Sequence, residues 1–419
     1  MKYLQEVSSY RQLNQAWRHV RKKRNVTPGI DGVSVQDFNS KLKSNLTKIS
    51  EDLKDHKYEF NKVTEIKIPK HSDPLNQTFR PIRIFSIRDK IVQRSIQISL
   101  ERSAKTTLFP ELKNNISIGF LQKSYAGEAV GVKLAVNRIK QYYKDGYKYL
   151  TTMDIKDFFE KIPKRKLLSI IMSRCGGDKS LKELLNKCLD PEIVKIDRYT
   201  GIESALPSTH SGVAQGSILS PLFTNIYLIK FDKVLEEKNI KALRYADDVA
   251  IFSKNPREAK KQLYHIPKIL DATSNLKFYS LGSKKPPQRY RIESSAKYLG
   301  IHIRKAYQSR WIVEPTSEKV NYQLGSITDA LNPSRPEILF VRVDFLNRSI
   351  NSWIKTYSYV GCTKKELTQI YMQLKEKYES GLNHLLLTRK IIRTGLTKQQ
   401  LAFLNILSPR TNPFKKRRK

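Results

Sequence analysis

The sequence predicts an α/β core followed by an all-α region. Short apolar runs alternate with amphipathic helical segments up to about residue 305, the pattern of an α/β core. From about residue 306 to 405 the spacing of apolar residues is mostly helical, and the chain ends in the basic tail NPFKKRRK. With 419 residues, the chain is long enough for two or three hydrophobic cores.

The first third of the sequence contains helices and a basic hairpin. Helical spacing predicts helices over residues 1–25 and 34–55, separated by the turn sequence TPGIDGVS. Alternation over residues 59–70 and the run RPIRIF at 80–85 predict the two strands of the hairpin. Two further helices are expected over residues 87–106 and 126–145.

The middle of the sequence places acidic residues at the ends of apolar runs. YKYLTTMDIKDFFEKI (147–162) predicts a strand that ends at Asp154 and enters a helix. One helix is expected over residues 220–238, with Pro221 near its start. ALRYADDVAIFSK (242–254) has two short apolar runs around an acidic pair. A helix over 256–272, a Lys-rich turn and the run AKYLGIHIRK (296–305) follow.

The charge of the chain favours a nucleic-acid partner. Seventy-eight Lys and Arg residues stand against 39 Asp and Glu residues, for a formal net charge of +39. A folded chain with this imbalance repels itself, and bound phosphate groups would offset the repulsion. A ribosome-like structural role or an anionic membrane surface would also suit the charge, but we favour nucleic acid.

Cysteine content and hydropathy exclude several classes of protein. The three cysteines form no CxxC pair, which argues against a disulfide framework and a Cys-rich zinc module. The N-terminus has no long apolar stretch of the kind that a secretory signal requires, and no run is long enough for a membrane helix. We therefore expect an intracellular, soluble protein.

The acidic pair Asp247–Asp248 needs a physical explanation, because adjacent carboxylates repel and are costly to bury without a partner. If the strand that ends at Asp154 lies beside this pair, the carboxylates converge at a sheet edge and form a site for Mg²⁺. Two such ions, about 4 Å apart, can activate a 3′-hydroxyl and stabilise a leaving pyrophosphate. Each feature also has a simpler explanation when it is considered alone. The Asp247–Asp248 pair could be a solvated turn, and Asp154 could cap the helix that follows it.

The order of several motifs decides between these interpretations. They are TPGIDG, IPK…RPIRI…DKIVQ, GFLQKSYA, DIKDFF, AQGSILSPLFTNIYL, YADD, LGSKK and YLGI. In this order the sequence resembles the reverse transcriptases of bacterial retroelements, especially the group II intron-like branch, over roughly residues 20–360. The resemblance implies a right-hand polymerase whose mixed or antiparallel palm sheet precedes an all-α thumb. It implies fingers over residues 1–105, a palm with the remaining fingers elements over 106–305, and a thumb with a basic tail over 306–419.

The resemblance also implies roles for individual residues. Asp154, Asp247 and Asp248 match the catalytic, metal-binding aspartates, with Ile155 also in the metal site and two Mg²⁺ ions (or Mn²⁺ as a substitute) as cofactor. Phe159 matches a steric gate, whose ring excludes a 2′-hydroxyl by contact; the alternative is a core aromatic. The other nucleotide-binding residues that it implies are Lys70, Arg80, Gln215, Gly216 and Lys284, with Lys285 an equally close alternative to Lys284.

Further matches concern the primer and template. Tyr298, Leu299 and Gly300 resemble a primer-grip hairpin, although YLG alone would read as a core strand, and Trp353 resembles an aromatic anchor of the thumb. Lys70 and Arg80 have a solvated basic face as their alternative. Two positions depart from the family pattern: Ala214 replaces a usual proline, and Ser217 replaces a usual second glycine. Arg244 and Tyr245, which flank the acidic turn, are expected to be structural.

The implied activity is RNA-directed DNA polymerisation on an RNA template, with a DNA or RNA primer and deoxynucleoside triphosphates. We favour a bacterial cytoplasmic enzyme of antiviral (phage) defence that copies a dedicated noncoding RNA, because resemblance to the splicing domain fades beyond Tyr359. The alternative is a group II intron maturase without an endonuclease, and a third reading is a non-catalytic splicing factor. Assembly as a homo-oligomer or with a partner protein stays open.

Overall fold

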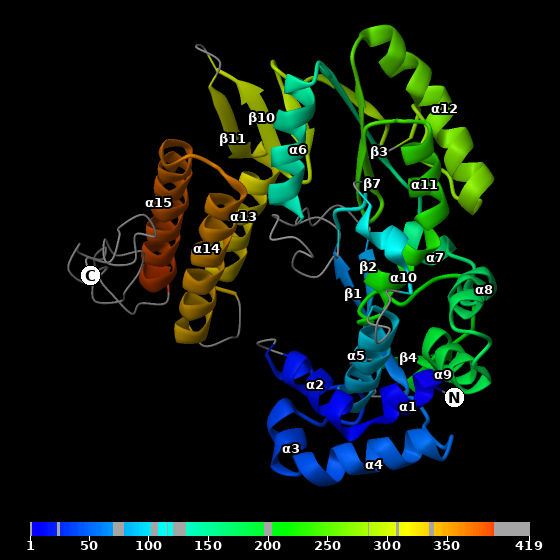
Figure 1. Ribbon diagram of the computed structural model, residues 1–419. Helices are drawn as coiled ribbons and strands as arrows, with labels where there is room; N and C mark the ends of the chain where they lie inside the picture. Colours follow the sequence, from blue (N-terminus) through cyan, green and yellow to red (C-terminus); the bar gives the residue numbers. More distant parts are fainter. Residues whose placement is uncertain are drawn as a thin grey trace, which may run out of the picture.

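The computed structural model describes residues 2–22, 26–69, 79–101, 108–114, 116–119, 131–196, 203–283, 285–306, 310–334 and 339–388. Figure 1 shows a layer of N-terminal helices at one end, sheets in the middle and at the other end, and three C-terminal helices packed together at one side. None of the helices in these ranges combines the length and the apolar character that crossing a bilayer requires.

The N-terminal layer has more helices than the sequence pattern predicts. The segment expected as one helix over 1–25 divides at Ser9, whose hydroxyl accepts a hydrogen bond from Gln12 N over 3.3 Å and caps the second helix. The segment 34–55 divides at Lys41. The elements up to residue 113 are α1 (Lys2–Ser8), α2 (Tyr10–Arg21), α3 (Val35–Ser40), α4 (Leu42–Lys54), β1 (Val63–Pro69), β2 (Phe79–Ile84), α5 (Ile87–Glu101) and the 3₁₀ turn η1 (Pro110–Lys113).

The predicted basic hairpin is present and extends into a sheet. Strands β1 and β2 are antiparallel, and β1 also pairs in parallel with β4 (Ile193–Ile196), which pairs with β5 (Glu203–Leu206). The sequence pattern did not indicate β4 and β5. These strands follow α7 (Phe158–Lys161), α8 (Lys164–Arg174) and α9 (Lys179–Leu189).

The second sheet is fully antiparallel and has the order β6-β7-β3-β8. Helices α11 and α12 lie along it in Figure 1, and α12 contacts both β3 and β7. Its elements, with the helices before and after it, are α6 (Val132–Lys144), β3 (Tyr149–Asp154), α10 (Ser220–Tyr227), α11 (Ile229–Glu237), β6 (Ala242–Tyr245), β7 (Asp248–Ser253), α12 (Pro256–Ser274) and β8 (Gln288–Arg291).

The helix predicted over residues 220–238 is in fact two helices that meet at Leu228. Nearly every residue of α10 is buried, whereas α11 buries only part of its surface. The two segments therefore have different surroundings, and Leu228, at φ −94° and ψ 4°, separates them. The periodicity of the apolar residues does not reveal this break because it continues through it.

The C-terminal region begins with a strand, which corrects the prediction of a helical region from residue 306. Strand β11 (Trp311–Pro315) pairs with β10 (Ile301–Lys305), which pairs with β9 (Ala296–Tyr298). The run is only five residues long, too short for its periodicity to be read. The helices then follow as α13 (Ser317–Ala330), α14 (Leu339–Val360) and α15 (Lys364–Thr388), with a shared core.

Candidate active site

The predicted convergence of the three aspartates is present. Strands β3 and β7 are antiparallel with Asp154 directly opposite Asp248, and β6 pairs with β7 so that Tyr245 also faces Asp248. The two-residue turn between these strands contains Ala246, at φ +55°, and Asp247. Ile155 N donates to Asp247 O over 3.0 Å and ties the end of β3 to the turn.

The electrostatics of the turn favour an added positive charge. Burial, then the neighbouring charges of Asp247 and Asp154, raises the pKa of Asp248 to about 7. Burial and the charge of Asp154 also raise the pKa of Asp247, and Lys285 and Arg80 oppose this increase. Both carboxyl groups are thus poorly compensated in the protein alone, and a nearby cation would stabilise their ionised forms.

The donor set of the acidic turn suits a hard divalent cation, but its present arrangement is not a completed metal site. Across the described part of the chain, no three His, Cys, Asp or Glu side chains are grouped so that they could hold a metal ion. One oxygen of Asp154, Oδ2, instead accepts a hydrogen bond from Lys285 Nζ over 2.7 Å. Carboxylate oxygens are the ligands that Mg²⁺ prefers, so the residue types fit the ion. Ile155 has a buried aliphatic side chain, so the atom that it could offer to an ion is its main-chain carbonyl oxygen.

Phe159, Gln215 and Gly216 lie close to one another. Phe159 is half-buried on α7, next to the fully buried ring of Phe158 at a centroid distance of 5.6 Å. Val213 N donates to Phe159 O over 2.7 Å, which holds the loop that carries Gln215 and Gly216 against α7. Gln215 Nε2 also donates to Glu160 Oε1 over 2.9 Å.

Gly216 joins this loop to the basic hairpin. Arg83 N donates to Gln215 O over 2.7 Å, and a Cβ at Gly216 would lie 2.1 Å from Arg83 O. Gly216 also has φ +114°, a conformation that other residues rarely adopt. The loop and strand β2 can therefore approach each other only because this residue is glycine.

Ser217, one of the two departures from the family pattern, has a structural explanation. Its hydroxyl donates to the buried Gln93 Oε1 over 3.2 Å and accepts from Leu219 N over 3.2 Å. Ile218 N donates to the same Gln93 oxygen over 3.0 Å. The serine thus links the loop to α5 in a way that a glycine could not.

The predicted basic residues are only partly described. Arg80 is exposed on β2, and its charge acts on Asp247. Lys70 and Lys284 lie outside the described residues. Lys285, the alternative to Lys284, is the lysine that pairs with Asp154.

The segment Tyr298–Gly300 forms the turn between β9 and β10. Leu299 has φ +52° and Gly300 φ +74°, as in the tight turns that match the twist of antiparallel strands. The Tyr298 side chain is buried, and its hydroxyl donates to Asp248 O over 3.1 Å. Tyr298 therefore holds the start of β7 through this buried hydrogen bond. Leu299, in the same segment, lines a groove beside the turn.

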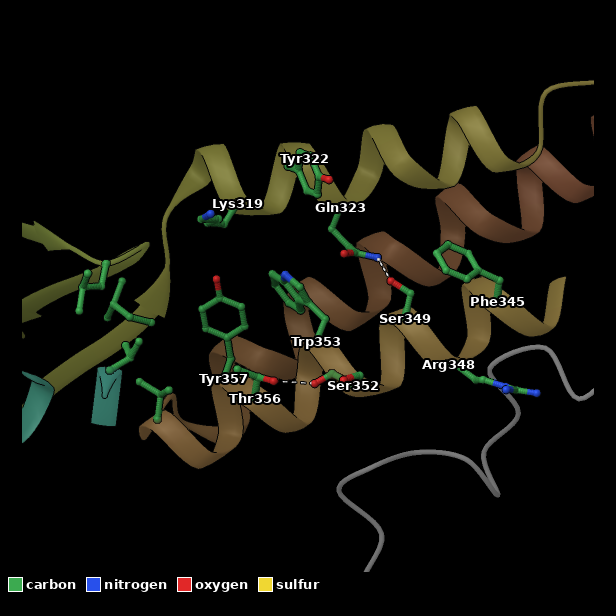
Figure 2. A pocket seen from close by; sticks show the side chains of 14 residues that line it. Lys319, Tyr322, Gln323, Phe345, Arg348, Ser349, Ser352, Trp353, Thr356 and Tyr357 are labelled. Carbon is green, nitrogen blue, oxygen red and sulfur yellow. Dashed lines mark hydrogen bonds between the residues drawn. The ribbon is translucent and has the colours of Figure 1, made fainter. Parts of the chain in front are cut away.

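A groove of about 760 Å³ runs from this turn along α13 and α14. Figure 2 shows Trp353 and Tyr357 on α14 facing Lys319 and Tyr322 on α13 across the groove, with Gln323 bonded to Ser349 further along. Trp353 is half-buried, and its ring lies 4.4 Å from that of Tyr357. Most of the lining residues are uncharged, four of them are aromatic and two, Lys319 and Arg348, are basic, so the groove offers contacts to the sugars and bases of a nucleic acid as well as to its phosphates.

Lys319 is a site residue that the sequence analysis missed. It lines the groove, its side chain packs against Gly300, and its charge lowers the pKa of Asp248. It stands at the start of an ordinary amphipathic helix in a lysine-rich chain, so no local pattern distinguishes it. Only the packing of α13 beside the turn reveals it.

Comparisons with known proteins identify the family. Residues 68–303 match the family described as reverse transcriptase (RNA-dependent DNA polymerase), and the chain belongs to this family. The predicted class and right-hand α/β fold are thereby confirmed.

The chain is similar to three known proteins. The chain is 28% identical over 236 residues to the COX1/OXI3 intron 2 protein of Saccharomyces cerevisiae, covering 56% of this chain and 25% of the relative. It is 25% identical to protein YkfC of Escherichia coli, covering 51% of each. It is 28% identical to the group II intron-encoded protein LtrA of Lactococcus lactis subsp. cremoris, covering 47% of this chain and 29% of LtrA. The chain thus spans about half or less of each relative.

Proposed function

We propose that this protein is an RNA-directed DNA polymerase whose active centre is the acidic turn. The observation that carries the proposal is the register that sets Asp154 opposite Asp248 at the edge of an antiparallel sheet, in a chain of the reverse transcriptase family. The surrounding charge supports it, because a net charge of +39 suits a polynucleotide substrate.

In this proposal Asp154, Asp247 and Asp248 hold Mg²⁺. Bound there, the ion would supply positive charge at the reacting phosphate and lower the pKa of the attacking hydroxyl. Lys285 would leave Asp154 Oδ2 as the ion binds, and its ammonium group would stay close to the triphosphate. The burial that raises the pKa of both turn aspartates also strengthens their attraction to a cation.

The remaining residues position the substrates. Arg80 offers a planar guanidinium suited to phosphate, and we assign Lys70 the same task. Phe159 lies under the nucleotide sugar, and the Gln215–Gly216 loop faces the base. Leu299, Gly300 and Trp353 contact the primer–template duplex in the groove. Residues 1–105, 106–305 and 306–419 serve as fingers, palm and thumb, with the thumb helices starting at Ser317.

Two biological settings suit this activity. Two of the relatives, an intron 2 protein and a group II intron-encoded protein, favour a role with an intron RNA. Copying of a dedicated noncoding RNA in bacterial phage defence, which we favoured from the sequence, stays a prediction. The RNA that co-purifies with the protein would distinguish the two, because intron domains and a short separate transcript are readily told apart by sequencing.

Primer extension tests the proposed activity directly. The purified protein is expected to extend oligo(dT) on poly(rA) with dTTP and Mg²⁺, and to lose activity when EDTA is added and regain it when Mg²⁺ or Mn²⁺ is restored. Incorporation of radiolabelled dTTP measures the product. A protein that binds the primer–template but never extends it would instead be a non-catalytic RNA-binding factor.

RNA affinity is expected to fall steeply with salt. Between 50 and 200 mM NaCl the dissociation constant should rise by roughly 10³-fold, as counterion release predicts for about six or more phosphate contacts. Fluorescence anisotropy with a labelled structured RNA measures it. An unlabelled acidic protein as competitor provides the control for nonspecific attraction. A flat salt response would mean that the excess of Lys and Arg serves another purpose.

A further inference from the structure

The residue before the acidic turn forms a buried ion pair. Arg244 on β6 and Asp232 on α11 both have fully buried side chains. Arg244 Nε donates to Asp232 Oδ1 over 2.8 Å, and Arg244 Nη2 donates to Asp232 Oδ2. Each charge would be costly at this place without the other, so the two-pronged contact stabilises both.

The third nitrogen of this guanidinium is directed at the turn. Arg244 Nη1 donates to Ala246 O over 3.3 Å and to Asn225 Oδ1 over 3.1 Å. Ala246 is the turn residue with φ +55°, which a residue other than glycine keeps only where its surroundings hold it. The ion pair thus contacts the backbone directly before Asp247.

A second layer of hydrogen bonds holds the pair itself. Asn225 Nδ2 donates to Gly119 O over 2.9 Å, and Asn114 Nδ2 donates to Asp232 Oδ2 over 3.3 Å. A Cβ on Gly119 would lie 3.0 Å from Tyr245 Cα, so this loop packs closely on the turn. The backbone of Arg244 also pairs with the same loop through Ile116 O and Ile118 N, over 2.7 and 2.9 Å.

We propose that Arg244 and Asp232 are a positioning pair that sets the place of the Asp247 and Asp248 carboxylates. The carboxylate of Asp232 orients the guanidinium, and the guanidinium holds the Ala246 carbonyl. Neither residue reaches the surface, so the pair acts on the reaction only through the turn. The part of this proposal that is tested by DNA synthesis rests on the proposed polymerase function.

The test replaces the pair with apolar residues of similar size, Arg244→Met together with Asp232→Leu. A double change leaves no unpaired buried charge, and such replacements often fold well. The matched control is Ser253→Ala with Gln262→Leu. It removes another buried hydrogen-bonded pair, at the end of strand β7 that lies away from the acidic turn. Thermal unfolding of both variants shows whether either has lost its fold.

The Arg244/Asp232 variant is expected to lose about 10- to 100-fold in kcat for primer extension, since small displacements of reacting groups have effects of this size. Its KM for dTTP and its Kd for the primer–template should stay within about 2-fold of the unaltered protein, because kcat alone depends on the placement of the turn. The control variant should keep kcat. An equal loss of kcat in both variants would overturn the proposal.

Hydrogen exchange supplies a readout that does not need activity. The Ile155 amide donates to Asp247 O, so its exchange rate reports on the turn. It should exchange faster in the Arg244/Asp232 variant and at the unaltered rate in the control; unchanged exchange in both overturns the proposal. If the unaltered protein fails to extend a primer, the proposed polymerase function is refuted. The hydrogen-exchange result then decides by itself whether Arg244 and Asp232 position the turn.

Arg244→Lys provides the conservative comparison. Lysine keeps the positive charge beside Asp232 but cannot make the two-pronged contact and reach the Ala246 carbonyl together. This variant should therefore show the same selective loss of kcat and faster exchange at Ile155. Full activity with lysine would show that only the charge is needed, and would overturn the assigned role of the hydrogen bond to the turn.

Discussion

Replacing Asp247 and Asp248 with alanine should abolish DNA synthesis and leave RNA affinity nearly unchanged. The two carboxylates share the edge of the sheet with Asp154, and burial raises the pKa of both. Their removal leaves no set of oxygen ligands around the reacting phosphate. RNA affinity should persist because it comes from Lys and Arg side chains spread over the chain.

Synthesis by this double variant is expected to fall by at least about 10³-fold, since loss of a single charge-stabilising group often costs 10²–10³ in rate. Primer extension measures the loss, and anisotropy with labelled RNA measures binding. Asp145→Ala with Asp271→Ala, at exposed helix ends, is a control that removes the same charge elsewhere. Equal losses of synthesis and binding would contradict this division of labour.

Replacing Phe159 with alanine should raise the incorporation of ribonucleotides relative to deoxynucleotides. The half-buried ring stands on α7 beside the loop of Gln215 and Gly216, where we place the nucleotide sugar. Loss of the ring would make room for a 2′-hydroxyl. The ratio of kcat/KM for dTTP to that for UTP should fall by about 10- to 100-fold, the usual range for selection by shape alone.

Phe158→Leu is the matched control for Phe159→Ala. Phe158 is the neighbouring ring and is fully buried, so its replacement disturbs packing without opening the nucleotide site. The control should lower thermal stability and leave the dTTP/UTP ratio unchanged. A ratio that is the same in Phe159→Ala and in the unaltered protein would assign Phe159 to the core.

The sequence itself was sufficient to determine the family, the α/β core and the approach of Asp154 to the acidic pair. These features depend on short local patterns in a fixed order: a strand that ends in Asp154, a tight turn with two aspartates, and the loop with Gln215 and Gly216. The alternation of apolar residues and the identity of turn residues depend only on adjacent positions in the sequence. Strands β3 and β7 were therefore expected at nearly their observed bounds.

Other features depended on contacts between segments far apart in the chain. The break at Leu228 separates helices α10 and α11, which differ in burial, and the place of Lys319 follows from the packing of α13 beside Gly300. The presence of Ser217 in place of the family's usual glycine is explained by the hydrogen bond from the Ser217 hydroxyl to Gln93, which only the folded structure shows. The role of Arg244 likewise required its partner on α11.

The sequence alone thus predicted the residues to which we assign the chemistry, and the tertiary structure decided what surrounds them. Residue types and the local periodicity of apolar residues can be recognised in a single sequence, because they involve only positions that are close in the chain. The pairing of a buried charge, the partner of a hydroxyl and the walls of a groove depend on side chains brought together by folding.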